Sequence, residues 1–473
     1  MYQPPIVNFP VFSVTWSEAT DAATGASSPA VLTAGGGGAG NTGVGNKISL
    51  IAFEGGANQP SHAIAHEIET SPETCNCVAA SDNGQLLAAA FGKEVRIYAS
   101  NPSGFYQMAK VQADFATKES GVNSMAFVDG THRGGGGGSM LLATGGEDGV
   151  LRVWELRANS RRESGSSDEG DGCKPPSLSV NMVKECRGHG KPVTCVRFHP
   201  SAKLVLTASK DGTCRLWDWE RGSEAAMMTT TSGLPPTASA AKTPAIMCRS
   251  CCFSPDKPTA LFSVQSGPRG NAYVTEWRYL VRPVDAGGRG IAYDVSPVKV
   301  ALVSPHPATS LSIRSDGARL AVGNVEGTVL VYRLPGFAKV VEYPAHDLPV
   351  TGLCFASKDA GAALGGYDLL AGSADYKITL FKSQGGATKL AVRQAMVFLW
   401  SLIVFLFKAI YWLVRISVAV ALTVVPILGL VALVLAVVYR PHELAAVTRA
   451  LIGQEEDSGL DDADPDSAPP IVA

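Results

Sequence analysis

The chain of 473 residues has little net charge and few charged residues of any kind. Lys and Arg number 40 against 42 Asp and Glu, and these four residue types make up 17% of the sequence. A nucleic-acid-binding domain presents a basic surface, so this balance gives no reason to expect a nucleic-acid partner. The 46% apolar content excludes a chain that is disordered throughout, and the 50 glycines lack the three-residue period of collagen.

Basic residues are also absent from the first part of the chain, since no Lys or Arg precedes Lys47. The basic start of a signal peptide and the Arg-rich pattern of a transit peptide are therefore missing. We expect the ten cysteines to be free thiols in a reducing cytosol. Cys248 and Cys251 form a CxxC, but no second Cys or His pair stands at zinc spacing, so we expect no metal or redox site there.

Charge is absent altogether from residues 416–439, which read ISVAVALTVVPILGLVALVLAVVY. As a helix this segment would extend about 36 Å, enough to cross a hydrocarbon core of about 30 Å. Pro426 is compatible with this, because membrane helices tolerate proline. We predict a transmembrane helix over 416–439 and a short acidic lumenal tail over 440–473.

The segment 386–415 is expected to be an amphipathic, interfacial lead-in. Its apolar run, 396–407, is too short to span a membrane and is followed by Lys408 and Arg415. The aromatic residues that suit the headgroup layer are Trp400, Tyr411 and Trp412. One long tilted helix through both segments, or a second span, remains the alternative.

Basic residues are more numerous before the predicted span than after it. Those before it are Lys382, Lys389, Arg393, Lys408 and Arg415, and those after it are Arg440 and Arg449. The positive-inside rule therefore predicts that residues 1–385 lie in the cytosol and that the C-terminus is lumenal.

A strand-rich pattern repeats through residues 1–385. Residues 188–217, GHGKPVTCVRFHPSAKLVLTASKDGTCRLW, combine a Gly-His start, two β-rich runs, an Asp-Gly turn and a Trp-Asp close with Asp218. This segment resembles a WD repeat, the four-stranded blade of a β-propeller. The other copies are residues 11–53, 77–98, 139–156, 247–277, 309–332 and 345–382. Seven copies predict an all-β, seven-bladed propeller that closes between its first and last blades.

The length that the blades do not use falls in three biased segments. They are a glycine run at 134–138, a Ser- and acid-rich stretch at 160–172, and a Ser/Thr/Ala/Pro tract at 225–241. We expect all three to be solvated loops.

The first copy breaks the pattern between its second and third strands. A plain hairpin needs two turn residues, whereas Gly35–Asn46 supplies twelve. A GxGxxG match at 38–43 is followed by a strand, so no helix N-terminus is present to hold a pyrophosphate, and no Lys-Ser/Thr follows for a Walker loop. Two interpretations remain. The segment is a low-complexity glycine loop, or it is a shaped loop whose backbone groups converge on an ion or a partner.

A cytosolic seven-bladed propeller, one C-terminal span and an AGGGG…TGxxNK loop in the first blade together resemble a specific family. It is the endoplasmic-reticulum guanine-nucleotide exchange factor that starts assembly of coat protein complex II, called prolactin regulatory element-binding protein in animals. The specific part of the resemblance is short, residues 35–38 and 43–47. In that family the loop is the catalytic element and holds a potassium ion.

The resemblance implies roles for individual residues. Asn46 would be the asparagine that is essential for exchange, and Asn41, where loop length varies, is the second choice. The residues implied to contact the GTPase or the ion are Gly35, Gly36, Gly37, Gly38, Thr42, Gly43 and Lys47. Potassium would bind through backbone oxygens of Gly35–Asn46, with no organic cofactor. Because Asn46 is expected on an exposed loop, Asn46→Ala should slow exchange about 100-fold and leave folding nearly unchanged.

The implied partner is the small Ras-like GTPase of coat protein complex II. The implied location is the endoplasmic-reticulum membrane, with one pass, at the start of endoplasmic-reticulum-to-Golgi transport. Exchange acts through protein contact and makes or breaks no covalent bond, so the chain is not expected to be an enzyme in that sense. The alternative is a non-catalytic, membrane-anchored WD scaffold that recruits partners. Such a scaffold has no need of an oversized glycine loop.

Overall fold

The computed structural model describes most of the chain in two compact units, residues 1–385 and 386–473. The described residues are 7–20, 27–38, 40, 42–55, 60–101, 103–117, 121–129, 139–158, 178–229, 246–283, 291–383, 387–439 and 447–448. The two units are treated separately below.

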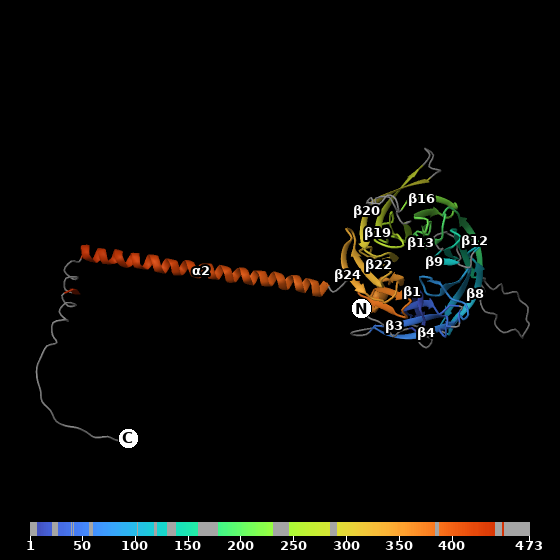
Figure 1. Ribbon diagram of the computed structural model, residues 1–473, viewed down its shortest axis with the longest axis horizontal. Helices are drawn as coiled ribbons and strands as arrows, with labels where there is room; N and C mark the ends of the chain where they lie inside the picture. Colours follow the sequence, from blue (N-terminus) through green and yellow to red (C-terminus); the bar gives the residue numbers. More distant parts are fainter. Residues whose placement is uncertain are drawn as a thin grey trace, which may run out of the picture. The chain divides into compact units, whose positions relative to one another are not determined.

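The first unit is a ring of seven antiparallel sheets (Figure 1). Blade 1 contains β1 (Val11–Thr20), β2 (Ser27–Gly35), β3 (Lys47–Glu54) and β4 (Ser61–Glu69). Blade 2 contains β5 (Cys77–Ala80), β6 (Leu86–Phe91), β7 (Glu94–Asn101) and β8 (Gly104–Gln112). Blade 3 contains β9 (Val122–Asp129), β10 (Ser139–Gly146), β11 (Leu151–Ala158) and β12 (Leu178–Cys186).

The remaining blades follow in chain order. Blade 4 contains β13 (Val193–Phe198), β14 (Leu204–Ser209), β15 (Thr213–Asp218) and β16 (Ser223–Thr229). Blade 5 contains β17 (Met247–Phe253), β18 (Ala260–Ser266), β19 (Ala272–Pro283) and β20 (Ile291–Ser304). Blade 6 contains β21 (Ala308–Ile313), β22 (Arg319–Asn324), β23 (Thr328–Arg333) and β24 (Ala338–Pro344). Blade 7 contains β25 (Val350–Phe355), β26 (Leu369–Ser373) and β27 (Ile378–Phe381).

Ring closure joins the first strand of blade 1 to the first strand of blade 7. The Trp16 indole N–H donates to the Cys354 carbonyl at 3.2 Å, and the Thr351 hydroxyl donates to the Val11 carbonyl at 2.7 Å. Apolar residues of each blade pack against the next blade, so every sheet buries both faces. The predicted seven-bladed, all-β propeller is confirmed.

Two details differ from the repeat pattern. Among the described residues blade 7 has three strands instead of four, and the short helix α1 (Lys358–Ala363) lies between its first two strands, with Ser357 as N-cap. The tract expected to be a loop from residue 225 begins inside the outer strand β16, whose residues up to Thr229 are ordered in the sheet. The rest of that tract and the stretches 134–138 and 160–172 lie outside the described residues.

The turn of blade 4 shows what holds an ordinary blade together. The Asp211 carboxylate accepts hydrogen bonds from the His189 ring at 3.0 Å and from the Thr213 backbone N–H at 2.8 Å. The other ring nitrogen of His189 lies 2.7 Å from the Thr207 hydroxyl, which also accepts the Trp217 indole N–H at 2.8 Å. This series of hydrogen bonds links strands β14 and β15 and their turn to the segment before β13.

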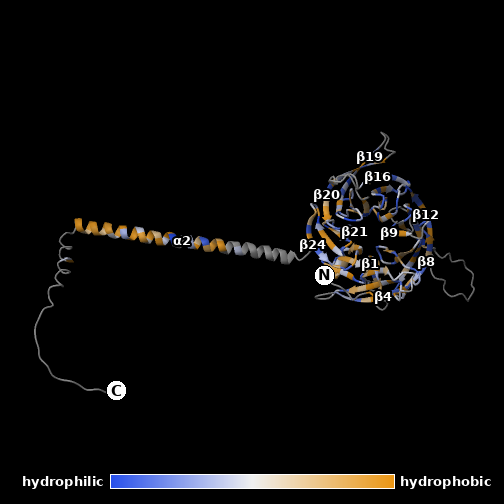
Figure 2. Cartoon of the chain, viewed as in Figure 1, coloured by the Kyte–Doolittle hydropathy of each residue, from blue (hydrophilic) through white to orange (hydrophobic). Residues whose placement is uncertain are grey.

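The second unit contains one continuous helix, α2 (Ala387–Tyr439), which runs through Pro426. Within it, Val404–Val438 is long and apolar enough to cross a membrane (Figure 2), and none of its described side chains is buried. The helix therefore passes without a break through the boundary predicted between an interfacial segment at 386–415 and a span at 416–439, and the apolar stretch begins before Lys408. The acidic tail lies outside the described residues, apart from 447–448.

The cysteines lie in the propeller. The nine described cysteines are free thiols, and eight of them are buried. The CxxC of Cys248 and Cys251 lies in β17, packed with Cys195 and Cys214. No group of three or more His, Cys, Asp or Glu among the described residues is arranged to hold a metal ion.

Candidate functional site

The connection between β2 and β3 in blade 1 is much longer than its counterparts. It comprises residues 36–46, whereas the second and third strands of the other blades are joined by two to five residues. The β2–β3 ladder ends at the pair Gly35 and Lys47, so the whole insertion starts from the last rung of a regular sheet. A rigid blade therefore carries one long loop at its edge.

Asn46 closes the base of this loop with its side chain. The Gly38 backbone N–H donates to Asn46 Oδ1 at 3.0 Å, and Asn46 Nδ2 donates back to the Gly38 carbonyl at 3.0 Å. The side-chain amide thus pairs with both backbone groups of one residue, as a residue on a neighbouring strand would. This bridge separates a closed base from a tip whose described residues are 40 and 42–45.

The segment after β4, residues 70–72, forms further hydrogen bonds with Asn46. Asn46 Nδ2 also donates to the Pro72 carbonyl at 3.1 Å, and the Asn46 backbone N–H donates to the Ser71 hydroxyl at 3.0 Å. The Thr70 N–H donates to the Asn46 carbonyl at 2.8 Å. With these bonds every polar group of Asn46 is partnered, and the residue is only 1% exposed.

The glycines at the base allow a close backbone approach. A Cβ on Gly35 would lie 1.8 Å from the Pro10 carbonyl oxygen, and one on Gly36 would lie 2.1 Å from Asn46 Oδ1. Gly36 also has a φ of +146°, which side-chain-bearing residues rarely adopt. A Cβ on Gly37 would lie 2.1 Å from the Thr42 hydroxyl. Three consecutive glycines are therefore required by packing, which disfavours the low-complexity interpretation.

The tip carries the exposed part of the loop. Gly40, Thr42 and Gly43 are exposed, and Gly43 has a φ of +75° with open space around it. The Thr42 hydroxyl accepts the Val44 N–H at 3.4 Å and lies 3.5 Å from the Gly37 carbonyl, which holds the tip to the base. Asn41, the second choice for the essential asparagine, lies outside the described residues.

Lys47 and the acidic residues beside the loop form its charged surroundings. Lys47 Nζ pairs with Glu67 Oε1 at 2.5 Å, so this lysine is committed to β4. Glu69 lies beside Gly45 and accepts the Ser71 hydroxyl. Exposed carboxylates therefore border the loop on the side of β4.

Glu73 continues this acidic border into blade 2. It pairs with Arg96 at 2.7 Å, and Arg96 also pairs with Glu94 at 2.7 Å. Burial lowers the pKa of Arg96, but the bonds to Glu94 and Glu73 outweigh this effect and raise it above its usual value. The guanidinium stays charged and ties the support segment to the neighbouring blade.

The geometry corrects one expectation and adds residues to the site. Asn46 was expected to present its amide from an exposed loop, but it is buried and all of its amide bonds are internal. Its direct role in the structure is to shape the loop. The support from Thr70, Ser71 and Pro72 was missed, because nothing in the sequence links residues 70–72 to residue 46 before the register of β3 with β4 is known.

Comparison with known proteins supports the repeat architecture. The profile of the family described as WD domain, G-beta repeat matches residues 110–155 and 180–218. Coronin-like protein crn1 of Schizosaccharomyces pombe is 32% identical over 17% of this chain and 12% of its own length. Pre-mRNA-processing factor 19 of Bos taurus is 25% identical over 37% of this chain and 29% of its own length.

A third relative is similar over a longer stretch. SEC12-like protein 2 of Arabidopsis thaliana is 26% identical over 52% of this chain and 50% of its own length. The chain therefore spans at most half the length of these three relatives.

Proposed function

We propose that this chain is a guanine-nucleotide exchange factor for a small Ras-like GTPase of coat protein complex II, anchored in the endoplasmic-reticulum membrane. The observation that carries the proposal is the blade-1 loop, which is too long for a hairpin and is held in one shape by Asn46 and three glycines. The similarity to SEC12-like protein 2 over half the chain supports it. A recruiting scaffold would need none of this construction.

The mechanism follows from how a GTPase holds its nucleotide. GDP is bound through backbone amides, a lysine and Mg²⁺ around its phosphates. An exchange factor accelerates release by binding the open, nucleotide-poor conformation more tightly than the closed one, and only that difference in affinity shifts the equilibrium. The exposed backbone of Gly40, Thr42 and Gly43 contacts the open conformation of the GTPase. Asn46 acts as a positioning residue that holds the tip in the shape this contact requires.

Potassium is a second element of the proposal. The loop offers uncharged oxygen donors, the Gly37 and Gly38 carbonyls and the Thr42 hydroxyl, and a carbonyl that accepts one hydrogen bond keeps a second lone pair. Rings of backbone carbonyls are a known environment for K⁺. Exchange and melting temperature should both be higher in K⁺ than in Na⁺. Equal values in the two salts at matched ionic strength would remove the ion from the account.

Attachment through helix α2 holds the propeller, and with it this loop, at the membrane. Helix α2 provides an apolar stretch of sufficient length, and the excess of basic residues before it favours a cytosolic propeller. Protease treatment of sealed microsomes tests the orientation. A tag at Ala473 should be protected while one at Met1 is digested, and the opposite pattern would reverse the topology.

The exchange proposal is tested by GDP release from the coat GTPase, measured with the full chain reconstituted in liposomes. The wild-type chain should accelerate release, and Gly36→Ala should lose most of this activity because its Cβ displaces the Asn46 side chain. Gly104→Ala is the matched control, since Gly104 has a similar φ of +136° but lies in blade 2 with open space around it. If the wild-type chain binds the GTPase and leaves GDP release unchanged, the recruiting scaffold is the better account.

A further inference from the structure

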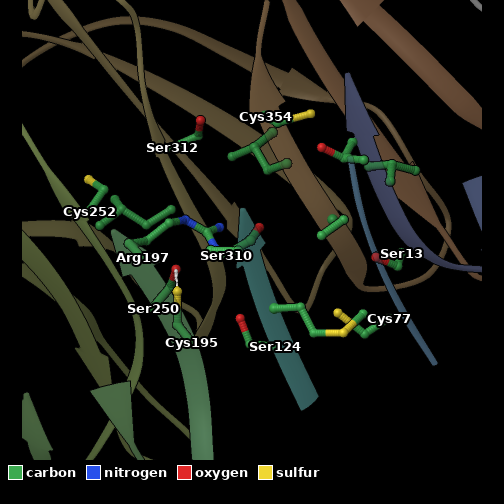
Figure 3. A pocket seen from close by; sticks show the side chains of 18 of the residues that line it. Ser13, Cys77, Ser124, Cys195, Arg197, Ser250, Cys252, Ser310, Ser312 and Cys354 are labelled. Atoms are coloured by element: carbon green, nitrogen blue, oxygen red, sulfur yellow. Dashed lines mark hydrogen bonds between the residues drawn. The ribbon is translucent and has the colours of Figure 1, made fainter. Parts of the chain in front are cut away.

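A cavity of about 480 Å³ lies at the centre of the ring, lined by residues from the first strand of every blade (Figure 3). Its volume falls in the range of small-molecule sites. Among the described residues that line it there is no Asp or Glu, whereas Arg197 and Arg249 both line it. The cavity is therefore polar and positively charged.

Arg249, on β17, has no ion-pair partner among the described residues, and the residue is partly buried. Its Nε atom is buried without a hydrogen bond in the described structure, and burial alone lowers its pKa. A partly buried charge loses part of its hydration, and a nearby anion compensates for that loss. A cation left in this state is the expected partner of an anion that enters from solution.

Arg197, on β13, provides a second guanidinium. Nη1 donates to the Val196 carbonyl at 2.8 Å, and no carboxylate pairs with it within the described residues. Figure 3 shows its nitrogens inside the cavity, toward Ser310. A hydrogen bond from Cys251 lowers the pKa of the Cys195 thiol, against the effect of burial, and the charge of Arg197 adds to this. Even an ionised Cys195 would leave one of the two positive charges unbalanced.

Three serines on different blades add neutral donors. The hydroxyl oxygens of Ser13, Ser124 and Ser312 each accept a backbone N–H of the next blade, at 3.1, 3.0 and 3.1 Å. An oxygen that accepts this bond still has its own O–H to donate. All three side chains line the cavity (Figure 3). The lining thus offers hydroxyl donors from several directions around two guanidinium groups.

We propose that the central cavity binds a small soluble phosphorylated anion. The planar fork of an arginine matches the geometry of phosphoryl oxygens. Donors that come from separate blades suit an anion with oxygens on several sides better than a flat carboxylate. Arg197 and Arg249 pair with the phosphoryl groups, and Ser13, Ser124 and Ser312 complete the set of hydrogen bonds. Occupancy of this site would stabilise the ring by linking blades through the ligand.

The test uses the full chain in nanodiscs with two probes, inorganic pyrophosphate and inositol hexakisphosphate, and chloride at matched ionic strength as the reference. Calorimetry should show binding of at least one probe, with a rise in melting temperature. Arg197→Gln and Arg249→Gln should each weaken binding at least about tenfold. Arg282→Gln is the control, since Arg282 lies exposed on β19, paired with Asp294, and binding should be unchanged.

The melting temperature without a probe gives a second readout. Arg249→Gln should leave it unchanged or raise it, because the substitution removes a partly buried charge that has no ion-pair partner among the described residues. Cys195→Ser should retain binding, since the proposal does not use the thiol. The proposal fails if neither probe raises the melting temperature beyond the chloride reference. It also fails if both arginine variants bind a probe as tightly as the wild-type chain and the Arg282 control.

Discussion

Blades 1 and 4 differ in the connection between their second and third strands, which is a long loop in blade 1 and a short turn in blade 4. In each, a short polar side chain closes the connection between the second and third strands. In blade 4, Asp211 closes a turn of three residues, 210–212, and ties it to His189. In blade 1, Asn46 bonds to Gly38 and leaves the described tip residues, 40 and 42–45, outside the closure. The comparison shows that closure by a short polar side chain stabilises a tight turn in blade 4 and holds a long exposed loop in blade 1.

We expect the largest effect when the long loop of blade 1 is replaced by an ordinary hairpin turn. Replacing residues 36–46 with a two-residue Asn-Gly turn keeps the β2–β3 register and suits the twist of the strands. We expect GDP release to slow by at least about 100-fold, equivalent to about 2.7 kcal/mol of lost transition-state stabilisation. The melting temperature should fall, because the bonds of Asn46 to residues 70–72 are lost with the loop, so release is measured well below it. Unchanged release with the short turn would take the loop out of the mechanism.

The converse change is Asp211→Ala in blade 4. It removes a carboxylate that accepts bonds from His189, Gly190 and Thr213, and of these donors the His189 side chain is buried. We expect a loss of about 2–3 kcal/mol in the free energy of unfolding, seen as a lower melting temperature. GDP release measured well below that temperature should be unchanged, because blade 4 displays no loop. A loss of exchange without a loss of stability would contradict this division of roles.

A smaller effect is expected from Lys47→Met at the edge of the loop. The Lys47–Glu67 pair is partly exposed, and such pairs contribute about 0.2–1 kcal/mol. Thermal unfolding should therefore change little, and GDP release should stay within a few-fold of wild type. A large loss of release would return Lys47 to the group of residues that contact the GTPase.

The pH dependence gives the smallest effect and concerns the ordinary blades. Burial lowers the pKa of His346 and of His199 below the usual value near 6.5. The unfolded chain then binds more protons than the folded chain as the pH falls below that value, so stability is complete above about pH 7 and declines toward pH 5. Melting curves at several pH values check this. His346→Gln should reduce the slope, and an unchanged slope would show that other groups set it.

The fold was largely predictable from the sequence, because WD signatures repeat and strand periodicity is a local property. The hydrogen-bonded residues His189, Thr207, Asp211 and Trp217 of blade 4 lie in the segment where the sequence has Gly-His, Asp-Gly and Trp-Asp at fixed spacing. Blade 7 carries the same start at Ala345-His346 but has three described strands, and no local pattern marks the missing one. The continuous helix α2 was open as an alternative, because Lys408 and Arg415 interrupt the apolar run without breaking a helix.

The site was predictable in position but not in mechanism. The glycine run and Asn46 were found from sequence because they interrupt a repeat. The burial of Asn46 was not, because it depends on residues 70–72, which β4 brings back beside the loop. The place of Arg249 in the central cavity was also not predictable, since only the closed ring shows that no carboxylate of the described residues lines that cavity.

The central claim is that Asn46 acts by holding the loop. Asn46→Asp tests it most directly, because the side chain keeps its size while the Nδ2 donor becomes an oxygen that faces the Gly38 and Pro72 carbonyls. Measured with the full chain in liposomes, well below the melting temperature, GDP release should slow about 100-fold, as much as in Asn46→Ala. The melting temperature should fall in both variants. GDP release at the wild-type rate by Asn46→Asp would contradict the account. So would a loss of GDP release in this variant with an unchanged melting temperature.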